Sequence, residues 1–173
     1  MRIVTNTGAD RVIDLMLPEM KPGHRLDAVT SALSLFAYAA AMSESNQLAQ
    51  ARLLLPRDDI DLERLAAEAD RMARNQLQTR WLAKRFAEWL RAKAEVRRAA
   101  GRVPQGALVL RDENGEPRQA VLGALALSTE GLGTTPGNPL NLIHASETPE
   151  ESRLISQWFD LQWTALQARP DEK

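Results

Sequence analysis

Two short apolar runs with a helical segment between them constrain the fold of this chain more than any other feature. Residues 25–33 alternate between apolar and small polar side chains, as in a strand buried on at least one face. Ser34 then precedes an apolar, alanine-rich segment typical of a helix that ends near residue 47. Residues 51–55 form a continuous apolar run before Pro56, which suits an interior strand. This order predicts a βαβ unit with a largely parallel sheet, and therefore an α/β fold.

Further patterns on both sides of this unit extend the predicted sheet to about seven strands, with helices on both faces. We expect the additional strands at residues 1–6, 95–98, 106–110, 118–127 and 138–144. We expect the additional helices at residues 11–20, at residues 62–93 and after Thr148. Thr148, Pro149 and Glu151 have the spacing of a capping box with proline at the first helical position, which predicts where the last helix begins.

Composition restricts the class of protein. The 173 residues, 44% of them hydrophobic, suit a single domain over residues 1–173. The chain has no cysteine and no paired metal-ligand spacing, so we expect no disulfide, metal or other cofactor. Its apolar runs are far shorter than the ~20 residues that span a bilayer, and no signal sequence opens it. We therefore expect a soluble cytoplasmic protein with no membrane partner.

Positive charge is concentrated in residues 71–102, which contain ten basic and two acidic residues, although the whole chain has a net charge of −1. Helical spacing places Arg80, Lys84 and Arg91 on one face, opposite most of the apolar stripe. The basic residues of the strand and loop that follow are Arg97, Arg98 and Arg102. This pattern is typical either of a solvated helix face or of a ridge that contacts the phosphates of nucleic acid.

The tryptophans are the candidate anchors for contacts with a partner. Apolar spacing predicts Trp89 and Trp158 in the core, and leaves Trp81 and Trp163 as candidate interface residues. In the last helix the apolar residues recur at i, i+3 and i+4 spacing, and we expect most of them in the core. They are Leu154, Ile155, Trp158, Phe159, Leu161 and Leu166.

Residues 105–133 contain two apolar β-runs joined by an Asn114-Gly115 turn, followed by a glycine-rich loop. This stretch resembles the catalytic hairpin of the phospholipase D-like family. The family's signature is His, Lys two residues on and Asp five residues later, then a strand ending in Gly-Ser-x-Asn and often a Gly-Leu pair. The matching positions are Asp112, Gly123, Gly131 and Leu132. The exchanged positions are Gln105 for His, Ala107 for Lys, Ala124 for Ser and Ala126 for Asn.

The resemblance extends over residues 80–165. The helix and strand of residues 81–97, and the spacing of Phe159 and Trp163, are similar to phospholipase D-like domains at the N-termini of bacterial Swi/Snf-like DNA-dependent ATPases. The family's reaction uses a His nucleophile, which this motif lacks, and His24 and His144 lie outside it. The resemblance thus implies a non-catalytic module that recruits a helicase-type motor to DNA or to partner proteins, with residues 71–102 as its contact surface.

Two alternatives remain open at the level of sequence. The chain could be a dimerisation or protein-interaction module that binds no nucleic acid. It could also be a divergent phosphodiesterase or nuclease with a reassigned site around Asp112 and Ser128. Asp112 also suits its own turn, and the loop of Ser128, Thr129, Gly131 and Gly133 is typical either of a phosphate-binding loop or of an ordinary connection.

Overall fold

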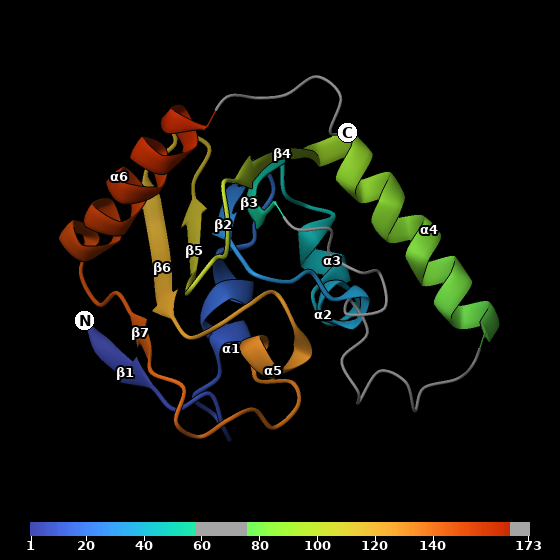
Figure 1. The fold of residues 1–173 in the computed structure, drawn as a ribbon, viewed down its shortest axis with the longest axis horizontal. Helices are drawn as coiled ribbons and strands as arrows, with labels where there is room; N and C mark the ends of the chain where they lie inside the picture. Colours follow the sequence, from blue (N-terminus) through green and yellow to red (C-terminus); the bar gives the residue numbers. More distant parts are fainter. Residues whose placement is uncertain (58–75, 167–173) are drawn as a thin grey trace.

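The chain forms a seven-stranded sheet with helices on both faces (Figure 1). The computed structural model describes residues 1–57 and 76–166. The strand order is β1-β7-β6-β5-β2-β3-β4. The strands are β1 (Arg2–Val4), β2 (Arg25–Val29), β3 (Gln50–Pro56), β4 (Ala94–Ala99), β5 (Gly106–Arg111), β6 (Pro117–Gly123) and β7 (Ile143–Ala145). The helices are α1 (Val12–Met16), the 3-10 helix η1 (Leu17–Glu19), α2 (Leu35–Ala40), α3 (Met42–Ser45), α4 (Gln76–Lys93), α5 (Thr129–Leu132) and α6 (Pro149–Ala165).

The predicted α/β class, strand number and placement of helices are confirmed, but the prediction of a mostly parallel sheet is wrong. Only β2–β3 and β3–β4 are parallel pairs. The four other pairs, β2–β5, β5–β6, β6–β7 and β1–β7, are antiparallel. Parallel neighbours need long crossover connections, whereas β5 and β6 are joined only by the tight turn after Arg111 and are therefore antiparallel.

The two faces of the sheet bury separate apolar clusters. Leu108 and Leu110 of β5 point into the larger cluster, which α1, α2 and α4 cover. Ala107 and Val109 alternate to the other face, where α6 covers them with Phe159 and other residues. The helices of the described segments include none that is long and apolar enough to cross a bilayer.

Local sequence signals locate most of the elements. Ser34 caps α2, accepting hydrogen bonds from the backbone N–H groups of Phe36 (3.2 Å) and Ala37 (3.3 Å). The capping box at Thr148 is present and α6 begins where it predicts. Strand β6 ends at Gly123 instead of residue 127, because Gly123 has a φ of 138° and turns the chain out of the sheet. The part of the predicted long helix that precedes residue 76 lies outside the described residues.

Helix α6 differs from the prediction in which of its apolar residues form the core. Ile155, Phe159 and Trp163 are buried, as are Ser152 and Ser156 on the same face. Trp158 is 39% exposed, and Trp163 is only 6% exposed, so the predicted roles of these two tryptophans are reversed. The reason is that α6 carries two apolar stripes, and spacing alone does not say which stripe meets the sheet. Trp89 is buried and Trp81 is exposed, as predicted.

Candidate functional site

The hairpin of β5 and β6 brings the motif positions to one end of two neighbouring strands. Gly106 pairs with Gly123, and Ala107 pairs with Leu122. Gln105 directly precedes β5 and Ala124 directly follows β6, so both lie at this end, and both are exposed. The positions where the resemblance places a catalytic site are therefore adjacent in space.

The residues at these positions offer no nucleophile for attack on a phosphodiester. Ala107 is 3% exposed and packs in the apolar cluster beneath α6, where the family has its lysine. The nearby hydroxyl of Thr30 donates to the Ala32 carbonyl oxygen (2.7 Å) and accepts from the Leu127 N–H (2.9 Å). Gln105 contributes a neutral amide. This end of the sheet thus presents the amide of Gln105 and the methyl groups of alanines, and the hydroxyl of Thr30 is already hydrogen-bonded within the protein.

The glycine-rich loop after β6 packs against its own backbone. A Cβ atom at Gly131 would overlap the carbonyl oxygen of Ala126, which explains why this position is a glycine. The Gly131 N–H donates to Ser128 Oγ (3.0 Å), and the Thr134 N–H donates to the Thr129 carbonyl oxygen (2.9 Å). These hydrogen bonds form within the loop and the short helix α5, as in an ordinary connection.

Asp112 lies at the opposite end of the hairpin from Ser128. The Asp112 carboxylate accepts from the backbone N–H groups of Asn114 (2.9 Å) and Glu116 (3.0 Å), which is the hydrogen bonding of its own turn. The seven residues of β6 separate the two, a length of about 20 Å. A reassigned catalytic site that uses Asp112 together with Ser128 is therefore incompatible with the fold.

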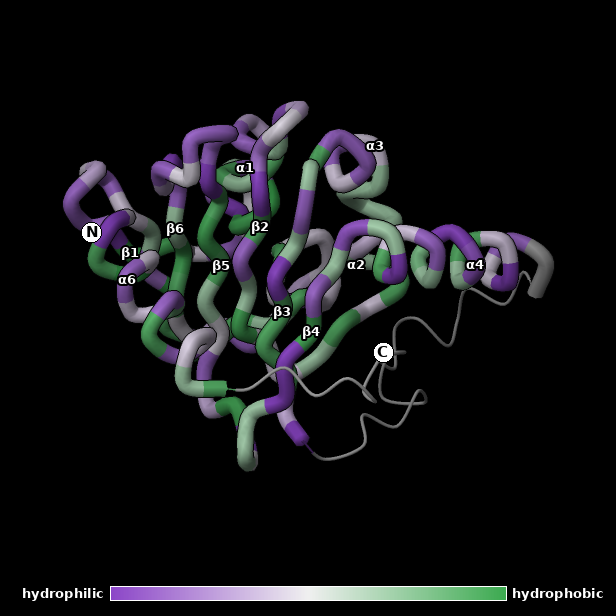
Figure 2. The backbone as a smooth tube through the Cα atoms, turned by 90° about the horizontal axis from the view of Figure 1, so that it is seen from above, coloured by the Kyte–Doolittle hydropathy of each residue, from purple (hydrophilic) through white to green (hydrophobic). Residues whose placement is uncertain are grey.

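Helix α4 presents the basic face that its sequence predicts. Arg80, Lys84 and Arg91 are exposed and lie within about 40° of one another around the helix. Leu82 and Trp89, on the opposite side, are buried. No described residue forms a hydrogen bond or ion pair with the side chains of these three cations. Figure 2 shows α4 extending beyond α2, away from the sheet, with hydrophilic residues recurring along it.

The basic residues after α4 do not continue this face as predicted. Arg97 points to the α6 side of the sheet, where its guanidinium lies 4.2 Å from the centre of the Trp163 ring and donates to the carbonyl oxygens of Trp163 (2.5 Å) and Leu166 (2.8 Å). Arg98 is half-buried and donates to the Pro56 carbonyl oxygen (3.2 Å). Arg102 is exposed in the loop after β4. Successive strand residues point to opposite faces, so Arg97 and Arg98 separate.

The sequence did not predict a charged cluster between the sheet and α6. Asp27 is fully buried on β2 and accepts from Arg52 (2.6 Å for each of two bonds) and Arg111 (2.5 Å). Asp160 of α6 pairs with both arginines at 2.9 Å. Burial acts to lower the pKa of Arg52, but the hydrogen bonds and charges of Asp27 and Asp160 outweigh it and raise the pKa. The available signal was Asp27 and Arg52 within two predicted strands, and Arg111 directly after a third.

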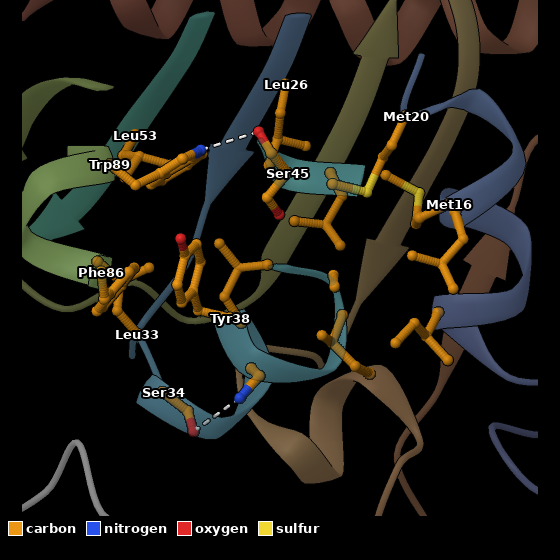
Figure 3. A pocket seen from close by; sticks show the side chains of 17 residues that line it. Met16, Met20, Leu26, Leu33, Ser34, Tyr38, Ser45, Leu53, Phe86 and Trp89 are labelled. Atoms are coloured by element: carbon orange, nitrogen blue, oxygen red, sulfur yellow. Dashed lines mark hydrogen bonds between the residues drawn. The ribbon is translucent and has the colours of Figure 1, made fainter. Parts of the chain in front are cut away.

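An apolar cavity of about 70 Å³ lies on the other face of the sheet, between α1, α2 and α4 (Figure 3). Met16, Met20, Tyr38, Phe86 and Trp89 point toward it (Figure 3). Two polar groups of its lining are hydrogen-bonded to other protein atoms. Trp89 Nε1 donates to the Ser45 carbonyl oxygen (2.9 Å), and the Ser34 hydroxyl caps α2. Binding sites for metabolites are several times larger and carry convergent polar groups. The cavity is therefore a packing space of the core.

A wider hollow of about 520 Å³ lies at the start of α6 and is lined on one side by the β5–β6 turn. It carries carboxylates and arginines together, and Arg153 pairs there with Glu116 (3.6 Å) and Glu150 (3.5 Å). Within residues 1–57 and 76–166, no group of three or more His, Cys, Asp or Glu residues could hold a metal ion.

Similarity to known proteins is found among solved structures. No protein-family model and no curated protein matches it. A chain of TrmBL2, an archaeal chromatin protein whose structure shows a novel mode of DNA binding, is similar in structure, with a TM-score of 0.45 and 11% sequence identity. The alignment covers 92% of the present chain and 52% of the TrmBL2 chain, so the present chain spans about half of that length.

Proposed function

We propose that this chain is a non-catalytic phospholipase D-like module that contacts the phosphate backbone of DNA through the outer face of α4. Its role is to hold a Swi/Snf-like DNA-dependent ATPase on DNA, as the resemblance in residues 80–165 implies. The observation that carries the proposal is the row of Arg80, Lys84 and Arg91, which are exposed and without described partners. Exposed cations in a row on one helix face can contact consecutive phosphates of a nucleic-acid backbone.

The dimensions of this face suit a nucleic-acid backbone. Arg80 and Arg91 are eleven residues apart, which corresponds to about 16 Å along the helix. Phosphates follow one another every 3.4 Å of axis along each DNA strand, so this length faces roughly five of them. Helix α4 contains five basic residues and a single acidic residue, Glu88, so repulsion of phosphates is small. The contact is with the backbone, and we expect it to be independent of base sequence.

The hairpin geometry supports the family kinship. In the family, the His and Lys of one strand face the Ser and Asn that follow the next, and the corresponding positions here meet at one end of β5 and β6. The exchanged residues support a module without turnover, because neither Gln105 nor Ala107 attacks phosphorus or neutralises an oxyanion. Turnover of a generic phosphodiester that survives stringent purification and is lost in Asp112→Ala would contradict this part of the proposal.

The binding experiment compares affinity for two DNA duplexes of unrelated sequence as the salt concentration is raised. The wild type should bind both alike, with log K falling linearly with log salt. Replacing Arg80, Lys84 and Arg91 together by Ala should lower affinity and reduce the magnitude of that slope by about 2.7, for three lost phosphate contacts. Thermal unfolding should be unchanged because all three side chains are exposed.

A matched control distinguishes a specific effect of the α4 face on DNA affinity from an effect of net charge. Lys21, Arg118 and Arg153 are exposed cations outside α4, and their joint replacement by Ala removes the same total charge. This variant should keep the wild-type salt slope. Wild-type protein that does not bind at low salt, or an α4 variant that binds as the control does, would overturn the proposal.

A further inference from the structure

The outer face of α6 is an apolar stripe with nothing from the described chain packed on it. Leu154 is 65% exposed, Trp158 is 39% exposed and Leu161 is 69% exposed. Their i, i+4, i+7 spacing places them within about 60° of one another around the helix. The buried residues Ile155, Phe159 and Trp163 lie on another side, against the sheet. Helix α6 therefore has one apolar face in the core and a second apolar face in solvent.

From Leu154 to Ala165, the exposed residues of this second face carry no charge. After Arg153, the exposed residues of α6 are Leu154, Gln157, Trp158, Leu161, Gln162, Thr164 and Ala165. The nearby carboxylate of Asp160 is held by Arg52 and Arg111. In a chain with 26% charged residues, an uncharged exposed face that includes tryptophan has the composition of a protein interface core. It lacks the cations that nucleic acid requires and the Lys and Arg that flank a membrane-surface helix.

The apolar surface continues onto the edge of the sheet. Ile3 of β1 is 60% exposed and pairs with His144, which in turn pairs with Leu122. Leu122 packs in the cluster beneath α6, so Ile3 lies on the same face of the sheet. Glu151 of α6 contacts the amino group of Met1, which places the first turn of α6 beside β1. The exposed apolar residues of α6 and β1 thus belong to one side of the molecule.

We propose that this side binds a second copy of the chain, with the two α6 helices packed antiparallel about a two-fold axis between Gln157 and Trp158. In this arrangement Leu154 of each copy meets Leu161 of the other, and Trp158 packs beside the axis. Arg153 meets Gln162, and Glu150 meets Ala165, so no like charges face each other. An identical surface on both copies gives a closed dimer, whereas a head-to-tail contact between copies leaves the stripe exposed on one of them.

The size of the surface sets the expected affinity. The exposed residues from Leu154 to Ala165 cover about 17 Å of helix, and Ile3 adds to them. Stable dimers bury roughly 800 Å² on each partner, and this surface consists of one face of a single helix with one residue of the neighbouring strand. We therefore expect a reversible dimer whose population rises with concentration.

Sedimentation equilibrium of the full chain over a wide concentration range tests the proposal. The mass should rise from 19.2 kDa toward twice that value. Leu161→Glu, which places a charge on the exposed stripe of each copy, should raise the dissociation constant by at least about tenfold without changing thermal unfolding. Trp81→Glu is the matched control, because Trp81 is an exposed apolar residue of α4, and it should dimerise as the wild type does. A monomer at every concentration, or a dimer unaffected by Leu161→Glu, would overturn the proposal.

Disulfide trapping tests the orientation, and the chain has no cysteine of its own to interfere. Leu154→Cys protein mixed with Leu161→Cys protein should oxidise to a cross-linked dimer. Each variant alone should cross-link several-fold less. Preferential cross-linking of Leu154→Cys to itself would indicate parallel helices or another register and would contradict the antiparallel arrangement with its axis between Gln157 and Trp158.

Discussion

Helices α4 and α6 have nearly the same length, 18 and 17 residues, and cover opposite faces of one sheet. Their outer surfaces are different in kind. Helix α4 exposes Arg80, Lys84 and Arg91, whereas α6 exposes Leu154 and Leu161. Both helices bury an apolar stripe against the sheet, so the buried face of a helix does not predict the chemistry of its exposed face. The basic face of α4 and the apolar face of α6 thus differ in the chemistry of the partner that each could bind.

The two helices also differ in how they are held. Helix α4 is held by aromatic packing: Tyr38 and Phe86 lie 4.8 Å apart between ring centroids, and Phe86 and Trp89 lie 6.3 Å apart. Helix α6 is held by Phe159 and Trp163 together with the ion pairs of Asp27, Asp160, Arg52 and Arg111. Helix α6, whose outer face is apolar, is thus attached to the sheet partly through ion pairs. Helix α4, whose outer face is basic, is attached through aromatic packing.

The largest expected effect is on the aromatic attachment of α4. Trp89→Ala removes a buried ring, its stacking on Phe86 and its hydrogen bond to the Ser45 carbonyl oxygen. It should lower the free energy of unfolding by about 4 kcal/mol in urea titrations. Trp81→Ala, the same change at an exposed position of the same helix, should cost less than about 0.5 kcal/mol. Equal costs for the two variants would show that α4 is not held through its Trp89 side.

A slightly smaller effect is expected at the ionic attachment of α6. Asp27→Ala leaves Arg52 and Arg111 with only Asp160 as a counter-ion, and should cost about 3 kcal/mol of unfolding free energy. Asp160→Ala is the comparison, since its side chain is 44% exposed and water replaces it more readily. The Asp160 variant should lose less stability than the Asp27 variant, and the opposite order in urea titrations would place the main attachment at the helix instead of the strand.

Elements defined by local chemistry were predictable from the sequence. Thr148, Pro149 and Glu151 specify the start of α6 because a capping box satisfies backbone donors within four residues. The Asn114-Gly115 turn specifies the hairpin, and Gly115 adopts the positive φ of 84° that such turns use. The face of α4 that carries Arg80 and Lys84 was also predictable, because helical spacing fixes which residues share a face.

Features that depend on distant parts of the chain were not predictable in the same way. The cluster of Asp27, Arg52 and Arg111 forms only because β2 lies between β3 and β5, an order that no local signal encodes. Trp158 and Trp163 lie on two apolar stripes of one helix, and only the docking of α6 on the sheet decides which is buried. The same holds for the candidate site. Helical spacing predicted the basic face of α4, but only the folded sheet shows that Arg97 points to the α6 side.

A third, smaller effect concerns the N-terminus of α6. Thr148→Ala removes the hydroxyl that accepts from the Glu151 N–H, and should cost about 1 kcal/mol of unfolding free energy. Thr164→Ala makes the same change near the end of the same helix, where the exposed hydroxyl donates to the Asp160 carbonyl oxygen, and should be nearly neutral. Hydrogen exchange should report the loss in the first turn of α6 and leave α4 unchanged. Loosening of both helices to the same extent would contradict the view that they are held independently.

The smallest effect distinguishes the two helices by pH. Hydrogen bonds from the Glu147 N–H, then the amino group of Met1 and the Thr148 N–H, hold the pKa of Glu151 below that of a free glutamate. The stabilisation is therefore complete above the unfolded-state pKa of about 4.3 and is lost as pH falls through the lower folded-state pKa. Acidification from pH 5 should reduce hydrogen-exchange protection in the first turn of α6 more than in the first turn of α4, which has no acidic residue. Glu151→Gln should remove this difference, and a pH response of α6 that persists in that variant would assign the effect to other carboxylates.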